Sequence, residues 1–185
     1  MSLTLSVKKA SAWEFVTFGS GGVSLGYFSA EIGQVVLRSP HGTEHTFSYG
    51  GAGAGLAAGL KIPKIGKVQI NTKKGGLTGT VGPFAFPSAG KIYLTESCEH
   101  EELEVADLRG PCLFIEAGGG LIAGGSGVAM ALDLNPLYLG LCLGPTAAIG
   151  IPLLLGSASA VLLMAGVNVG IQAQIGGAVY LGGLW

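Results

Sequence analysis

The amino-acid sequence predicts a mainly β protein, a glycine-rich β-sheet or barrel-like fold in a single domain over residues 1–185. Three observations support this. Glycine supplies 34 of the 185 residues, and each glycine inside a helix in water costs about 1 kcal/mol relative to alanine. Residues 167–176 alternate strictly between apolar and small or polar side chains, which is the period of a strand. Runs rich in β-branched and aromatic residues recur between glycines near the N-terminus.

The first region, residues 1–60, is predicted to hold glycine-rich strands. Four short runs have strand composition: residues 13–16, 23–27, 34–38 and 44–49. The tetrapeptide Ser39-Pro-His-Gly42 separates the last two and is typical of a turn. Residues 34–38 and 44–49 are therefore predicted to pair as a hairpin.

The second region, residues 61–110, carries most of the charge and is expected to form a polar face. Its basic part contains Lys61, Lys64, Lys67, Lys73 and Lys74, and its acidic part runs from Glu96 to Asp107. The lysines are candidates for contact with lipid head groups, each contributing about 1 kcal/mol near an anionic surface. The acidic part suits a basic partner such as a secretion chaperone or an inhibitor. We favour the alternative that the two parts pair with each other on a solvated face.

The third region, residues 111–185, is apolar and glycine-rich. Between residues 117 and 185, Asp133 is the only aspartate, glutamate, lysine, arginine or histidine. A surface this poor in charge is expected to face lipid, a partner or the protein's own core. Residues 134–167 are long enough to cross a bilayer of about 30 Å once or twice, although three prolines interrupt any helix there.

Strands are expected in this third region at residues 128–134 and 167–176, because both segments alternate with period two. Ten alternating residues also match the length of a tilted transmembrane strand. Short helices, where the region has any, are expected within residues 147–166. The region is thus interpreted as either membrane-active or a packed core.

Glycine spacing provides the most specific pattern of the chain. Gly51, Gly55 and Gly59 form two consecutive GxxxG steps, a glycine zipper. Single steps occur at Gly120/Gly124, Gly140/Gly144 and Gly166/Gly170. On helices such glycines let two backbones pack closely in a membrane or an oligomer. On strands the same glycines permit tight curvature or close contact between strands, and the sequence leaves both interpretations open.

Targeting and cysteine content bear on the compartment. Lys8 and Lys9 are not followed by the run of 7–15 apolar residues that a Sec signal needs, so synthesis in the cytoplasm and export by a specialised route are expected. Three widely spaced cysteines do not suggest a disulfide framework. A formal net charge of −1 gives no field that would attract nucleic acid.

The zipper at Gly51, Gly55 and Gly59, the missing Sec signal and the apolar residues 117–185 together resemble the pore-forming effectors of the bacterial type VI secretion system. This resemblance implies injection into competitor cells, homo-oligomerisation in their membrane, ion-conducting pores and a cognate immunity protein. It also implies that the chain has no catalytic residues. The strand-like alternation of residues 167–176 departs from a purely helical zipper channel.

Motifs that imitate enzyme signatures fail on their local context. His41-Gly-Thr-Glu-His45 has the spacing of a zinc protease, but it lies in an expected turn rather than on a helix. Cys98 and His100 are too few for a structural zinc site. Residues 53–58 imitate a dinucleotide fingerprint, yet no acidic residue follows about 20 positions later. The chain is therefore expected not to be an enzyme and to need no cofactor or metal.

The function predicted from the sequence is that of a pore-forming antibacterial toxin that inserts in a target-cell membrane and dissipates ion gradients. Its expected partners are membrane lipid, further copies of the chain, and an immunity protein or secretion chaperone. The alternative is a soluble glycine-rich β-barrel that oligomerises or binds an apolar ligand or partner protein without catalysis.

Overall fold

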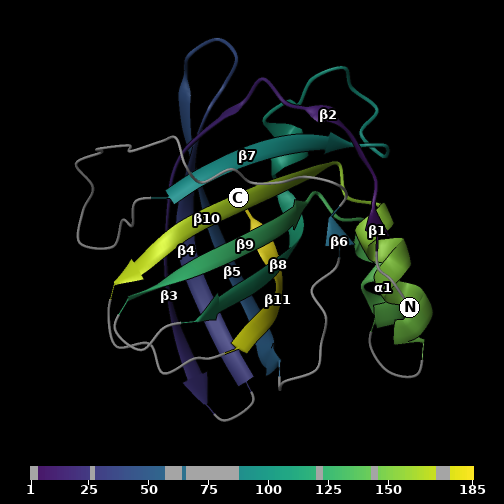
Figure 1. Ribbon diagram of the computed structural model, residues 1–185. Coiled ribbons are helices and arrows are strands. Elements are labelled where there is room, and N and C mark those ends of the chain that lie inside the picture. Colours follow the sequence, from purple (N-terminus) through teal and green to yellow (C-terminus); the bar gives the residue numbers. More distant parts are fainter. Residues whose placement is uncertain are drawn as a thin grey trace.

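A computed structural model of the protein describes residues 4–25, 28–56, 64–65, 88–119, 123–142, 146–169 and 176–185. Nine antiparallel strands form one sheet that curls into a half-barrel, and the helices are few and short (Figure 1). The predicted mainly β, single-domain fold is thereby confirmed. The division into three regions remains a prediction.

The sheet takes its strands from both ends of the chain. Its order is β2-β7-β10-β9-β8-β11-β5-β4-β3. The bounds are β2 (Val7–Ala10), β3 (Glu14–Leu25), β4 (Phe28–Arg38), β5 (Glu44–Leu56), β7 (Ser88–Thr95), β8 (Gly110–Gly119), β9 (Ala123–Leu132), β10 (Ala160–Val169) and β11 (Gly176–Leu184). The remaining elements are the parallel pair β1 (Thr4–Leu5) and β6 (Lys64–Ile65), the helix α1 (Ala147–Gly156), and the 3-10 turns η1 (Ala106–Leu108), η2 (Pro136–Tyr138) and η3 (Gly140–Cys142).

The predicted N-terminal hairpin is confirmed. β4 and β5 pair antiparallel from Arg38 opposite Glu44 onwards. Between them the backbone N–H of Gly42, which has a φ of 84°, donates to the Ser39 carbonyl at 2.9 Å. The Arg38 guanidinium bonds carboxylates on both neighbouring strands, Glu14 at 3.0 Å and Glu44 at 2.8 Å. These ion pairs connect three strands, and because they are exposed they add little stability.

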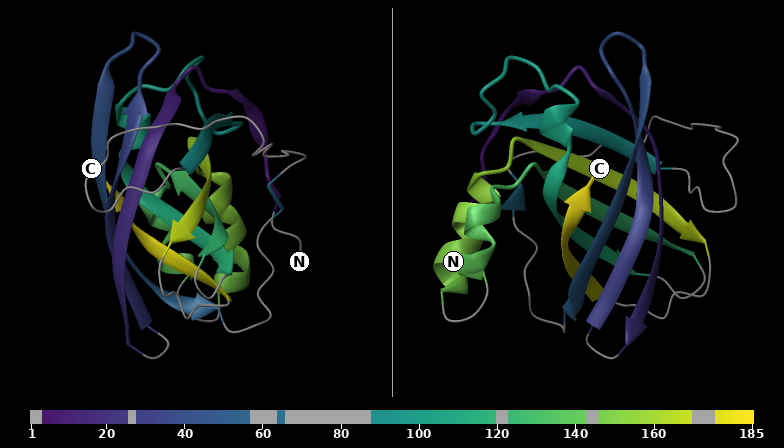
Figure 2. Two further views of the ribbon diagram at one scale, coloured as in Figure 1. Left: turned by 60° about the vertical axis from the view of Figure 1, so that its left-hand side comes forward. Right: turned by 180° about the vertical axis from the view of Figure 1, so that it is seen from behind.

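The C-terminal strand β11 lies in the middle of the sheet. It pairs with β5 on one side and with β8 on the other (Figure 2, yellow between blue and teal). The pairing continues one residue beyond β11, since Ser48 and Trp185 exchange two backbone hydrogen bonds of 3.0 and 2.9 Å. β11 therefore joins the N-terminal strands β3–β5 to the rest of the sheet.

The sheet curls until β3 approaches β7, although these two strands are not hydrogen-bonded neighbours. The Phe15 ring fills this seam and packs on Gly90, where an added Cβ would lie 2.5 Å from the ring. Nearby, the N–H of Ser11 still bonds the Ile92 carbonyl at 3.0 Å, just where β2 leaves β7. Side chains thus close the half-barrel where backbone pairing stops.

Two groups of apolar side chains lie on the two faces of the sheet. The interior group is centred on fully buried residues that include Phe47, Leu94, Met130 and Leu162. The second group lies between α1 and the outer face of β9 and β10, at one end of the sheet (Figure 1). The described part of the predicted polar region contributes to the interior, because β7 and the loop after it bury Ile92, Leu94, Leu103 and Leu108.

The remaining element predictions are confirmed in part. The strand predicted at 128–134 corresponds to the second half of β9. Of the strand predicted at 167–176, residues 167–169 belong to β10 and residue 176 to β11, and residues 170–175 lie outside the described part. The helix expected within 147–166 is real over 147–156, but residues 160–166 form a strand. Residues 160–164 of β10 are all buried, on both faces, so this part of the sequence shows no alternation.

Candidate functional site

Two of the three zipper glycines lie on a strand in this structure. Gly51 and Gly55 belong to β5, and Gly59 lies outside the described residues. Residues four apart share a face in a strand as well, so Gly51, Gly53 and Gly55 point to the same side of β5. The strand interpretation of the spacing therefore applies to Gly51 and Gly55.

Close contact between β5 and β11 explains why glycine is needed here. Gly53 is paired with Tyr180, and Gly51 with Gly182. A Cβ on Gly53 would overlap the carbonyl oxygen of Val179, and a Cβ on Gly182 would overlap that of Gly50. Sequence reasoning missed Gly53 and Gly182, because their contact depends on which strands become neighbours.

The other predicted packing glycines are dispersed. Gly124 lies on β9 opposite Asn168, Gly166 lies on β10 opposite Ser126, and Gly140 lies in η3. Three more, Gly120, Gly144 and Gly170, lie outside the described residues, as do four of the candidate head-group lysines, Lys61, Lys67, Lys73 and Lys74. Lys64 belongs to β6. A role of these residues in oligomer or lipid contact remains a prediction.

A buried carboxylate lies inside the half-barrel. Glu31 on β4 is 6% exposed, and its Oε1 accepts a 3.0 Å hydrogen bond from the Tyr49 hydroxyl. Its Oε2 is buried without a hydrogen-bond partner among the described residues. Burial raises the pKa of Glu31, although hydrogen bonds with Ser20 and Tyr49 act in the opposite direction. Ionised Glu31 is therefore a source of instability.

Replacing Glu31 with glutamine is expected to raise the melting temperature at neutral pH by a few degrees. The raised pKa means that the folded state favours the protonated acid. The stability that Glu31 contributes is fully present below its ordinary pKa and is lost as pH rises through the raised value. Thermal melts of the wild type, E31Q and the exposed control E96Q between pH 4 and 8 test this. A wild type that is as stable as E31Q at neutral pH would contradict it.

An unusual surface lies outside the sheet, built by η2, η3 and α1, which we call the apolar knob. Its large exposed side chains are Leu137 (80% exposed), Ile149 (65%), Leu153, Leu141 and Ile151. On its inner side, Leu154 and Leu155 of α1 pack on Leu134 and Val161. Gly150 lets α1 touch the backbone of η3, because a Cβ there would overlap Leu141.

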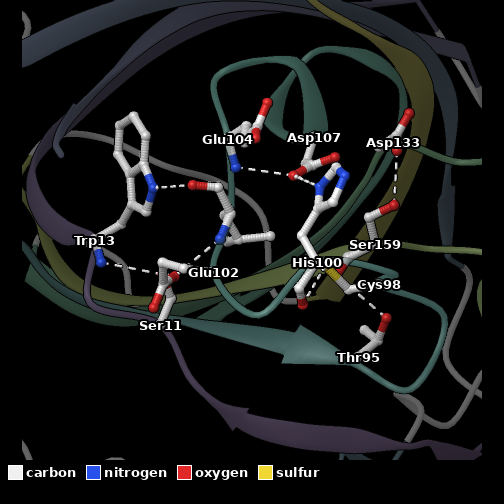
Figure 3. Close-up of polar contacts among 11 residues, drawn as sticks. Ser11, Trp13, Thr95, Cys98, His100, Glu102, Glu104, Asp107, Asp133 and Ser159 are labelled. Carbon is white, nitrogen blue, oxygen red and sulfur yellow. Dashed lines mark hydrogen bonds and ion pairs between the residues drawn. The ribbon is translucent and has the colours of Figure 1, made fainter. Parts of the chain in front are cut away.

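A pocket of about 710 Å³ adjoins the apolar knob. It is lined by apolar groups of η2 and α1, including Pro136 and Leu153, and by polar groups. Among the polar groups, Asp133 has a φ of 53° and accepts a 2.6 Å hydrogen bond from the Ser159 hydroxyl (Figure 3). Asp133, the only charged residue between residues 117 and 185, is thus held at the base of the knob by Ser159, which directly precedes β10.

The acidic loop after β7 is fastened to the turn between β2 and β3 (Figure 3). The Glu102 carboxylate accepts hydrogen bonds from the Ser11 hydroxyl and from the backbone N–H groups of Ala12 and Leu103. Burial alone would raise the pKa of Glu102, but these hydrogen bonds lower it overall. The Trp13 indole N–H donates to the Leu103 carbonyl at 2.7 Å. The loop is therefore an ordered part of the fold.

The predicted pairing of this loop with the lysines of residues 61–74 lies mostly outside the described residues. In the described part, Lys9 of β2 lies 3.8 Å from Glu101. His100 Nδ1 lies 2.9 Å from the Asp107 carboxylate, and this contact raises the pKa of His100.

The residues of the rejected enzyme motifs do not converge. His41 is in the β4–β5 turn, whereas His45 lies on β5 with its ring 5.3 Å from that of Trp13. Cys98 is buried and donates to the His100 carbonyl. The described residues contain no group of three or more metal-ligating side chains. They also contain no helix that combines the length and apolarity needed to span a membrane.

Comparison with known proteins places the chain in a family. The toxin protein Tse4 of Pseudomonas aeruginosa is 39% identical to it over 183 residues, covering 95% of this chain and 94% of the relative. The chain belongs to the Tse4 toxin family. The match with Tse4 covers nearly all of both sequences, so it includes the residues of the glycine-rich sheet as well as those of the apolar knob. No family model and no solved structure matches the chain.

Proposed function

We propose that the protein is an antibacterial toxin, delivered by type VI secretion, that inserts in the membrane of a target cell and dissipates its ion gradients. Membership in the Tse4 toxin family supports the toxin activity. The resemblance drawn from the glycine spacing and the apolar third region supports delivery and pore formation. The apolar knob carries the membrane part of the proposal, because large exposed aliphatic side chains gather there on a segment without charged residues.

The sheet offers a route to a rearranged, inserted form. Opening it at the seam between β3 and β7 separates the Phe15 ring from the backbone of Gly90 without breaking a backbone ladder between those two strands. Side-chain contacts at such a seam are lost more easily than the backbone hydrogen bonds between paired strands in the interior of a sheet. A copy opened at this seam exposes strand edges that can pair with another copy. We therefore propose that the membrane form is a homo-oligomer, and that a cognate immunity protein protects the producer.

Ion release from liposomes tests the proposed function. The purified protein is expected to release a trapped dye or K⁺ from vesicles at a low protein-to-lipid ratio. G55L is expected to abolish release, because Gly55 lies in the β5–β11 ladder opposite Ala178, two residues from Gly53, where the strands approach closely. G127L is the matched control, since Gly127 is also on a strand but faces open space. A monodisperse wild type that leaves vesicles intact would contradict pore formation and favour the soluble alternative.

A further inference from the structure

The helix α1 has no polar side chain at any position. Its ten residues, Ala-Ala-Ile-Gly-Ile-Pro-Leu-Leu-Leu-Gly, are apolar all the way round. Such a helix is normally enclosed in a protein core or surrounded by lipid. Here only one side of the helix is buried, where its Leu154 and Leu155 pack against the rest of the protein. On the other side, Ile149, Ile151 and Leu153 face outwards. Packing within the protein therefore explains why one side of α1 is apolar but not why the other is.

The exposed side of α1 continues onto the neighbouring turns. Leu137 of η2 and Leu141 of η3 extend the same apolar knob, and α1 packs directly on η3. The whole segment from residue 134 to residue 185 contains no aspartate, glutamate, lysine, arginine or histidine. The charged residue that lies at the base of the knob, Asp133, already accepts a hydrogen bond from the Ser159 hydroxyl. The exposed side chains of the knob itself are aliphatic, and their chemistry matches the hydrocarbon of a bilayer.

We propose that the apolar knob is the surface by which the protein first binds a lipid bilayer, with its five exposed aliphatic side chains inserted among the acyl chains. This rests on the proposed function, to which it adds the site and the chemistry of first contact. The ten residues of α1 are about 15 Å long, which is half of the bilayer's hydrocarbon thickness. α1 therefore lies in the interface at this stage and does not cross the membrane.

Salt dependence separates this surface from the lysines of residues 61–74. Insertion of aliphatic side chains is driven by removing apolar area from water and does not depend on lipid charge. Attraction of lysines to anionic head groups is screened by salt. Binding through the apolar knob is therefore expected to change less than twofold between low and high salt, and between neutral and anionic vesicles.

The test measures binding to phosphatidylcholine vesicles, with and without phosphatidylglycerol, by co-sedimentation. The double variant I149S/L153S is expected to bind about a hundredfold more weakly, about tenfold for each side chain removed from the acyl region. I32S is the matched control, because Ile32 on β4 is 70% exposed but lies outside the knob, and it is expected to bind within twofold of the wild type. Far-UV circular dichroism and a thermal melt verify that both variants are folded.

Each outcome decides the proposal. Weak binding by I149S/L153S with normal binding by I32S supports it. Normal binding by I149S/L153S overturns it, and so does binding that high salt abolishes. If the wild type forms a dimer without lipid and I149S/L153S is a monomer, the knob binds a second copy and the proposal fails. Binding that depends on the knob but releases no dye would contradict pore formation and leave this inference standing. Dye release that is as strong with I149S/L153S as with the wild type would contradict this inference and leave pore formation standing.

Discussion

Replacing Gly53 with valine is expected to destabilise the fold by about 3 kcal/mol or more, a large part of the 5–15 kcal/mol typical of a domain. A Cβ at this position would overlap the carbonyl oxygen of Val179 on β11. Backbone atoms of a central strand cannot turn aside as a flexible side chain can, so β5 and β11 would have to separate. Because β11 joins β3–β5 to the other strands, this separation affects the whole sheet.

Chemical denaturation of G53V beside G127V isolates this effect. Valine favours strands, so residue preference alone predicts that both variants gain stability. Gly127 on β9 has no atom within 4 Å of an added Cβ, and G127V is therefore expected to be neutral or stabilising. Equal unfolding midpoints for the two variants would contradict the close approach of Gly53 to the backbone of β11.

Replacing Trp13 with alanine is expected to cost about 3–5 kcal/mol, the usual range for removing a buried tryptophan. The side chain is 5% exposed and belongs to the interior cluster. Its indole N–H holds the Leu103 carbonyl, so the variant also leaves a buried acceptor without its donor. The acidic loop then keeps Glu102 as its main attachment to the turn before β3.

Two further variants separate the packing of Trp13 from its hydrogen bond. W13F keeps most of the ring volume and is expected to lose about 1–2 kcal/mol. W185A removes the exposed tryptophan, which is 61% accessible, and is expected to cost less than W13A. Urea unfolding followed by circular dichroism provides the comparison. A loss for W13A no larger than that for W185A would contradict the role of Trp13 as an anchor of the loop.

Local patterns in the sequence are sufficient to predict several elements. The hairpin of β4 and β5 follows from two β-rich runs around Ser39-Pro-His-Gly42, since turn and strand preferences act over a few residues. The second half of β9 follows from alternation at Val128–Leu132. The sequence predicts a helix somewhere within 147–166 but not its end, because residues 160–164 of β10 are buried on both faces and lack a period.

Long-range contacts account for what local patterns miss. The sequence shows that residues 134–167 lack charge, but Leu153 is exposed while its neighbours Leu154 and Leu155 are buried. That difference depends on where α1 rests on the sheet. Likewise, Gly53 and Gly182 become necessary only once β11 lies beside β5. In the sequence, nothing distinguishes Glu102 from the neighbouring acidic residues. Its role depends on the turn at Ser11 and Ala12, which lies beside it only in the folded protein.

The central place of β11 has a consequence for biosynthesis. β5 ends at residue 56 and β11 begins at residue 176, so the ribosome adds roughly 120 residues between them. At about 5–20 residues per second this takes on the order of ten seconds. During that interval the edge of β5 that later receives β11 has no partner from its own sheet. A nascent chain therefore cannot complete the nine-stranded sheet until translation has passed residue 184.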